Sequence, residues 1–163
     1  DLSAMDANRL PLYLEPLDLH TVTTSLQQFY AQTQGGERIR WNIPPHTYII
    51  LADEKALHSV LFHLLDNALK YAPLSDVLVN AEHADEMVCI QVQDFGTGIP
   101  EETMTHIFDR FFRANMADSQ VVYGHGLGLY MVKRFIEAMN GSVVAQNGSP
   151  SGTVFCVYLP VIK

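Results

Sequence analysis

Apolar residues recur along this chain at two spacings, and the wider one marks helices. Between residues 17 and 34 they lie three or four positions apart, which predicts a helix stopped by Gly35-Gly36. The strongest pattern begins at Asp53, a good N-cap, and runs to Tyr71 with its apolar residues on one face. A shorter helix is expected over 101–112. Another is expected over 127–139, ending at Asn140-Gly141 in the left-handed manner.

Short apolar runs between these segments predict strands at 38–43, 48–51, 77–81, 87–93, 142–146 and 153–161. The last two are expected to form a hairpin around residues 147–150. Residues 1–16 look like an irregular connector arriving from an upstream element, and 17–163 like one domain. The pattern predicts an α/β two-layer sandwich, with helices packed on one face of a mixed, mostly antiparallel sheet.

Composition narrows the function classes. A formal net charge of -8 argues against general nucleic-acid binding, which needs basic residues to neutralise phosphates. The N-terminus has neither an initiator Met nor the features of a signal peptide, so the chain is expected to be part of a longer protein. Cys89 and Cys156 sit in apolar runs and are expected to be buried free thiols, and the seven histidines lack metal-ligand spacing.

The first candidate site is Asp-Phe-Gly-Thr-Gly-Ile-Pro at residues 94–100. A carboxylate at the end of a strand can accept a hydrogen bond from the exocyclic amine of adenine, where guanine offers a carbonyl. The alternate glycines allow the backbone to come close to a ligand. Taken alone, this segment is equally typical of a tight glycine turn after a strand.

The second is Gly-His-Gly-Leu-Gly-Leu at residues 124–129, which leads directly into a helix. Backbone N–H groups at a helix start favour anions such as phosphates. The segment is neither a Walker loop nor a dinucleotide fingerprint, because Leu129 stands where the third glycine would be required. A glycine-rich packing turn is the alternative.

The third is one face of the helix over 53–71, where His63, Asn67, Lys70 and Tyr71 lie one turn apart. An amide oxygen is a good ligand for Mg²⁺, and a lysine can reach a phosphate. An ordinary solvated helix face would show the same pattern.

The order of these segments resembles the catalytic domain of sensor histidine kinases over roughly residues 17–161. Leu-Leu-Asp-Asn-Ala-Leu-Lys-Tyr at 64–71 resembles the N box, and residues 94–100 resemble the G1 box. Ile-Phe-Asp-Arg-Phe-Phe-Arg at 107–113 is similar to the F box, and 124–129 to the G2 box. The resemblance implies the Bergerat fold, shared with gyrase B, MutL-type proteins and some chaperones.

The resemblance also implies roles for single residues. Asp94 would bind the adenine amine, Asn67 would coordinate Mg²⁺, and Lys70 and Arg113 would contact phosphates of ATP. Residues between about 112 and 123 would form a lid. The remaining residues expected around the nucleotide are Gly96, Gly98, Tyr71, Ile99, Phe108, Gly124, His125, Gly126, Leu127, Gly128, Leu129 and His63.

Two departures from the family pattern bear on the reaction. His63 stands where gyrase-type relatives carry a glutamate that activates water, which favours phosphotransfer over hydrolysis. His125 replaces a small hydroxyl residue. A non-catalytic nucleotide-sensing module and a gyrase-type ATPase fragment are the alternatives to a kinase.

The resemblance implies a phosphoacceptor histidine on a separate helical dimerisation domain upstream, to which residues 1–16 would connect the ATP-binding catalytic domain at 17–163. His20 is not expected to be that acceptor. It further implies a response regulator downstream and no nucleic-acid partner. A homodimeric parent anchored in the bacterial inner membrane is expected, with this part cytoplasmic and monomeric.

Overall fold

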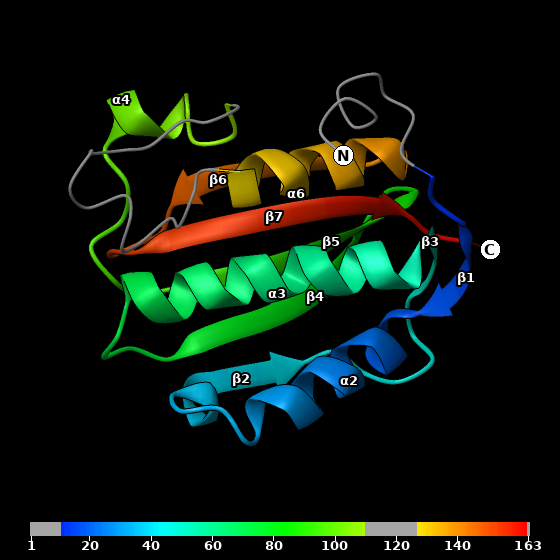
Figure 1. Ribbon diagram of the computed structural model, residues 1–163, viewed down its shortest axis with the longest axis horizontal. Helices are drawn as coiled ribbons and strands as arrows, with labels where there is room; N and C mark the ends of the chain where they lie inside the picture. Colours follow the sequence, from blue (N-terminus) through cyan, green and yellow to red (C-terminus); the bar gives the residue numbers. More distant parts are fainter. Residues whose placement is uncertain (1–10, 110–126, 163) are drawn as a thin grey trace.

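A five-stranded sheet forms one layer of the computed structural model, which describes residues 11–109 and 127–162 (Figure 1). The strand order is β2-β4-β5-β7-β6, in which β2 and β4 are parallel and the other neighbours are antiparallel. The strands are β2 (Ile39–Asn42), β4 (Val77–Ala84), β5 (Met87–Asp94), β7 (Thr153–Pro160) and β6 (Ser142–Asn147). Two short strands, β1 (Glu15–Asp18) and β3 (Ile49–Ala52), pair separately and antiparallel.

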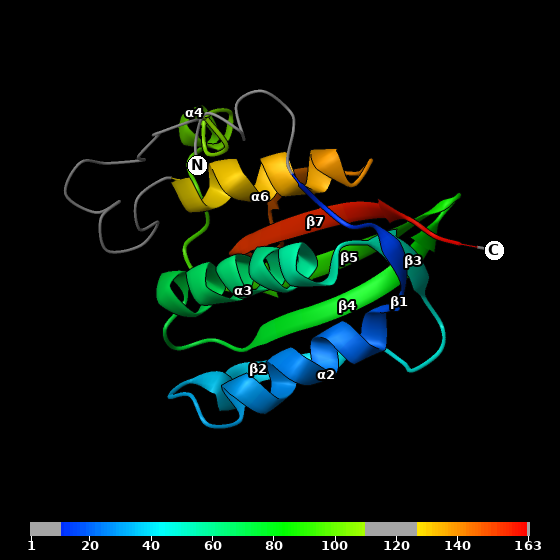
Figure 2. The same ribbon diagram turned by 45° about the vertical axis from the view of Figure 1, so that its right-hand side comes forward.

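Three helices form the second layer: α2 (Leu19–Tyr30), α3 (Glu54–Tyr71) and α6 (Leu127–Ala138). Helix α3 crosses the middle of the sheet, with α2 and α6 on its two sides (Figures 1 and 2). The predicted two-layer sandwich with a mixed, mostly antiparallel sheet is confirmed.

The core lies between these layers because each element places its apolar residues on the shared side. The apolar stripe of α3 is buried, and alternate residues of β4, β5 and β7 face it. Asp53 begins α3 as predicted, since its side chain accepts from the backbone N–H of Ala56 at 2.9 Å. Its other carboxylate oxygen accepts from Tyr13 N at 2.8 Å, which fixes the incoming chain beside the helix start.

The start of the chain is more ordered than its sequence indicates. Residues 15 and 16 were expected to be irregular, but Glu15–Asp18 pairs with β3, Glu15 opposite Ala52. Asp18 then caps α2 by accepting from His20 N at 3.0 Å, so this helix begins at Leu19 instead of residue 17. It ends at Tyr30, before the predicted limit of 34.

The expected helix over 101–112 is also wrong in length. Helix α4 covers Glu101–Met104 only. Turns follow, with His106 N bonded to Thr103 O and Asp109 N to His106 O, both at 2.9 Å. These i→i+3 bonds carry the chain out of α-helical geometry. Residues 110–112 lie outside the described part of the chain.

Other expectations agree with the structure. Strands β6 and β7 form the predicted hairpin, and Asn140 ends α6 with a φ of 65°. Cys89 and Cys156 are buried and free, and burial raises the pKa of Cys156 to about 11. Among the described helices, none is long and apolar enough to cross a membrane.

Candidate functional site

The end of β5 meets the end of α3, and this contact brings two of the predicted segments together. A Cβ on Gly96 would lie 2.9 Å from both Tyr71 O and the Ala72 side chain. Gly96 therefore permits a close approach that another residue would prevent. On the other side of α3, a Cβ on Gly128 would lie 3.6 Å from His63 Nδ1, so the start of α6 borders the same helix.

Asp94 is held firmly within this junction. It is 3% exposed, and its Oδ1 accepts from Gly96 N at 3.0 Å and from Thr153 N at 3.3 Å. Burial raises the pKa of Asp94, and the two backbone hydrogen bonds oppose this effect by favouring the ionised form. A buried carboxylate with a fixed orientation is suited to recognise a hydrogen-bond donor.

Thr153 is a site residue that the sequence analysis missed. The register of β5 and β7, with Gln93 opposite Val154, brings it beside Asp94. It is 1% exposed, and within the described residues its Oγ1 is buried without a hydrogen-bond partner. Because buried hydroxyls normally have a partner, this oxygen is available to a ligand or a water next to Asp94.

Asn147, at the end of β6, is a second missed residue. Its Oδ1 accepts from Ile99 N and its Nδ2 donates to Ile99 O, both at 2.9 Å. This pair of bonds fixes the turn at Gly98, whose φ of 81° favours glycine. Residues 99 and 147 lie far apart in the sequence, so only the predicted hairpin could have suggested the contact.

Gly152 closes the same turn from the other side. Its φ is 94°, and a Cβ there would lie 2.0 Å from Asp94 O. The hairpin connection between β6 and β7 therefore packs directly on the main chain of Asp94. The conformation of the 94–99 segment is set by tight contacts with the hairpin as well as by its own glycines.

The polar face of α3 is buried at one position and open at others. Asn67 is buried, with 9% of it exposed, whereas Lys70 forms an ion pair with Asp66, Nζ to Oδ2 at 2.9 Å, in which both side chains remain partly exposed. His63 lies on the exposed face of the helix. Desolvation around its ring lowers its pKa, Asp66 opposes this and Lys70 adds to it. Its imidazole is therefore neutral at neutral pH.

The other predicted residues are placed as follows. Tyr71 is half-buried against the core, and Ile99 and Leu129 are buried within it, each 2% exposed. Phe108 is half-buried with its ring edge-on to Phe155, the centroids 6.1 Å apart. Arg113, Gly124, His125 and Gly126 lie outside the described residues, as does the side chain of Leu127.

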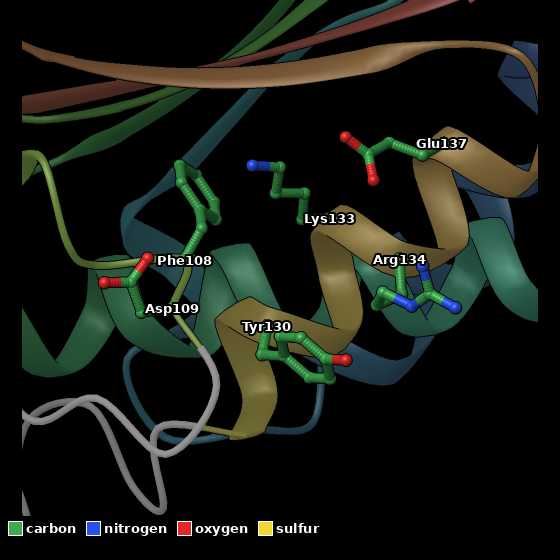
Figure 3. A pocket seen from close by; sticks show the side chains of 6 residues that line it. All are labelled: Phe108, Asp109, Tyr130, Lys133, Arg134 and Glu137. Atoms are coloured by element: carbon green, nitrogen blue, oxygen red, sulfur yellow. The ribbon is translucent and has the colours of Figure 1, made fainter. Parts of the chain in front are cut away.

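A separate pocket of about 370 Å³ lies along α6 (Figure 3). Of the predicted site residues, only Phe108 lines it. Its charged residues balance, two acidic and two basic, so the pocket has no strong preference for an anion. The lining residues are Phe108, Asp109, Tyr130, Lys133, Arg134 and Glu137.

Comparison with known proteins matches residues 52–163 to the family described as histidine kinase-, DNA gyrase B-, and HSP90-like ATPase. The chain is 32% identical to the sensor protein RprX of Bacteroides fragilis, over 99% of the chain and 32% of that protein. It is 33% identical to the adaptive-response sensory kinase SasA of Gloeothece citriformis, over 93% of the chain and 38% of that protein. The chain thus spans about a third of these curated relatives.

Solved structures show the same fold. Full-length ShkA, in complex with AMPPNP, superposes with a TM-score of 0.78 at 26% identity, covering 99% of this chain and 35% of ShkA. The mycobacterial sensor histidine kinase MprB gives a TM-score of 0.74 at 25% identity, covering 91% of this chain and 98% of the MprB chain.

Proposed function

Because the chain belongs to the histidine kinase-, DNA gyrase B- and HSP90-like ATPase family, we propose that it is the ATP-binding catalytic domain of a sensor histidine kinase. It transfers the γ-phosphoryl group of ATP to a histidine on a separate helical domain. One observation carries the proposal: the buried Asp94 carboxylate is fixed by Gly96 and Thr153 at the end of the polar face of α3.

Asp94 recognises adenine in this proposal. Its carboxylate accepts a hydrogen bond from the exocyclic amine, and Thr153 supplies a buried hydroxyl beside it. Gly96 lets the turn after Asp94 pack against Tyr71 and Ala72, and Gly98 supplies the positive φ that this turn requires. Guanine presents a carbonyl oxygen at the same place, so it would face a carboxylate oxygen and be rejected.

The phosphates lie along the polar face of α3 in this proposal. Lys70 exchanges part of its contact with Asp66 for a phosphate oxygen, and Arg113 and the backbone N–H groups of the glycine segment at 124–128 add to the binding. Phosphoryl transfer requires mainly positioning and neutralisation of charge, and these residue types supply both.

Mg²⁺ fits the donor set around Asn67. Magnesium is commonly held by one or two protein oxygens together with substrate phosphates and waters, so it does not need a protein cage. Within residues 11–109 and 127–162, no cluster of three or more His, Cys, Asp or Glu is placed to hold a metal. When bound, Mg²⁺ neutralises phosphate charge, and Asn67 is the residue that would hold it.

His63 bears on the fate of the phosphoryl group. It stands at the position where a hydrolytic family member would carry an acidic base, and desolvation lowers its pKa. The acidic residue that activates water in gyrase-type relatives is therefore replaced at this position. We therefore expect transfer to a histidine, with little hydrolysis by this chain alone.

The partners follow from the same proposal. They are the dimerisation and phosphoacceptor domain of the same protein and, downstream, a response regulator. The full-length protein is a homodimer anchored in the bacterial inner membrane, with this domain monomeric in the cytoplasm.

The test is a phosphotransfer assay. This chain, Mg-ATP and the helical domain encoded upstream of it in the same protein are mixed, and the products are examined for acid-labile phosphate. Label on the helical domain is expected, and Asp94→Asn should abolish it. Measurable ATP binding without any label on that authentic partner would contradict the proposal.

A further inference from the structure

Arg38 lies far in sequence from the residues of the candidate site, yet its side chain reaches the end of α3. It occupies the last position of a short 3₁₀ turn, Gly36–Arg38, just before β2. Its guanidinium donates to three main-chain carbonyls: Nη1 to Ala72 O at 2.5 Å and to Ser75 O at 2.8 Å, and Nη2 to Leu69 O at 3.2 Å.

The end of α3 needs such a donor. A carbonyl in the last turn of a helix lacks an intrahelical partner, and the N–H that Leu69 O would receive belongs to residue 73, a proline. A cation at this end also interacts favourably with the helix dipole. Gly35 makes room for it, because a Cβ there would lie 3.3 Å from Arg38 Nη2.

The same segment contacts the turn that follows Asp94. Ser75 Oγ accepts from Phe95 N at 3.3 Å, and Gly96 packs against Tyr71 and Ala72. Arg38 therefore binds the carbonyls of the segment on which the 95–96 turn rests. Within the described residues, its hydrogen bonds go to the carbonyls of Leu69, Ala72 and Ser75, and not to Asp94 or another position expected to contact the nucleotide.

We propose that Arg38 is a positioning residue for the nucleotide site. It holds the end of α3 and the turn at residues 72–75, here called the Ser75 turn, so that the main chain after Asp94 keeps its binding conformation. The inference rests on the proposed function, because it assigns to this turn the recognition of adenine. Arg38 therefore acts on the side of the site that binds the base, and it is not expected to affect the contacts with the phosphates.

Strand β2, which follows Arg38 directly, provides a matched control. Arg40, two residues further on, reaches the same connection through Asp76, with Nε to Oδ2 at 3.3 Å. That pair is largely exposed, 65% for Arg40 and 50% for Asp76, and among the described residues the side chain of Arg40 bonds to Asp76 and not to a carbonyl of α3. Arg38→Met and Arg40→Met therefore remove the same charge two residues apart, but only Arg38→Met removes the hydrogen bonds to the end of α3.

The first measurement is calorimetric binding of adenosine and of Mg-ATP. Arg38→Met should weaken both ligands by the same factor, on the order of tenfold, because the base pocket is common to them. Arg40→Met should bind like the wild type. Arg38→Lys should fall between, since an ammonium restores the charge but cannot bridge three carbonyls.

Ser75→Ala removes the hydroxyl that accepts from Phe95 N and leaves Arg38 unchanged, so it tests whether Arg38 acts through Ser75. If Arg38 acts through the Ser75 turn, the double variant Arg38→Met/Ser75→Ala should bind adenosine no more weakly than Arg38→Met alone. Additive losses of adenosine affinity in the double variant would contradict an action of Arg38 through Ser75. A loss of affinity for ATP alone, with adenosine binding unchanged, would contradict the assignment of Arg38 to the base side.

Amide hydrogen exchange decides the inference independently of ligand. In the unliganded domain, Arg38→Met should speed exchange at Phe95 N, whose acceptor is the Ser75 hydroxyl, and Arg40→Met should not. Unchanged exchange at Phe95 would overturn the proposal. If the wild type binds no nucleotide, the proposed function fails, while this comparison still settles whether Arg38 fixes the turn.

Discussion

Asp94 and Lys70 are both charged members of the proposed nucleotide site, but their surroundings differ. Asp94 is 3% exposed and bonded to two backbone N–H groups from separate elements. Lys70 projects from an open helix face and forms an ion pair with Asp66 one turn before it, in which both side chains are exposed by 40% or more.

The difference separates two tasks. The base has one shape and one hydrogen-bonding edge, so a rigid, desolvated pocket recognises it well. The phosphates and their metal change position and charge during a reaction, and a helix face with long, solvated side chains can follow them. We therefore expect mutations in the rigid surroundings of Asp94 to have different effects from mutations on the open face around Lys70.

The largest contrast is between two glycines. Gly152→Ala places a Cβ 2.0 Å from Asp94 O at a φ of 94°, so backbone must move, and a loss of about 3 kcal/mol in unfolding free energy is expected. Among the described residues, a Cβ introduced by Gly128→Ala meets His63 at 3.6 Å, an ordinary contact, so this substitution should change stability by less than about 1 kcal/mol. Denaturant unfolding of both variants measures the change in unfolding free energy. Equal losses of stability would contradict the difference between the rigid surroundings of Asp94 and the open face of α3.

Asp94→Asn should weaken ATP binding by about ten- to 100-fold, because one acceptor for the adenine amine becomes a donor. The variant keeps an oxygen for Gly96 N and Thr153 N, so the turn itself should persist. Titration calorimetry gives the affinity, and Asp66→Asn is the control with an equal change of charge on the open side. An affinity loss of the same size in both variants would mean that charge alone is responsible.

The same Asp94→Asn variant should be more stable than the wild type at pH 7. Burial raises the pKa of Asp94 above its usual 3.8, so the folded state binds a proton more readily than the unfolded chain does. The ionised carboxylate thus costs stability at neutral pH, and the cost disappears as pH falls through the raised pKa toward 3.8. Urea unfolding of both proteins from pH 7 to 4 should show that the stability difference between the variant and the wild type decreases. A difference that stays constant with pH would contradict this effect of the Asp94 charge.

Asn67→Ala tests the metal assignment. It should weaken ATP binding about tenfold with Mg²⁺ present and little without it, because only the metal-bound ligand uses the amide oxygen. Adenosine affinity should not change in either condition. A loss that is the same with and without Mg²⁺ would assign Asn67 to structure instead of to the metal.

The smallest effect is expected for the exposed ion pair. Asp66→Asn should lower stability by only about 0.3 kcal/mol, since helix pairs of this kind are weak and screened by salt. It should slightly strengthen ATP binding, because Lys70 no longer shares its charge with a carboxylate. Weaker binding would instead make Asp66 part of the phosphate site.

Sequence patterns were sufficient where structure is local. The cap at Asp53 and the apolar stripe that follows it define α3 without tertiary information, and the hairpin of β6 and β7 follows from its turn residues. The contacts of Thr153, Asn147 and Arg38 depend on strand register and on which helix end meets which loop. No local pattern carries that information.

The errors have the same origin. Glu15–Asp18 pairs because β3 offers a free edge, which cannot be read from an irregular segment containing a proline. Helix α4 ends early because Ile107 is drawn into the core, 2% exposed, by turns that a helical pattern does not indicate. Both outcomes are decided by neighbours that are distant in sequence.

The most direct test of the role assigned to Asp94 compares ATP with GTP by titration calorimetry on the unmodified chain. The two ligands carry the same phosphates and the same metal, so only the base side can distinguish them. If Asp94 recognises the adenine amine, ATP should bind at least about tenfold more tightly than GTP. Equal affinities would contradict the assignment of Asp94.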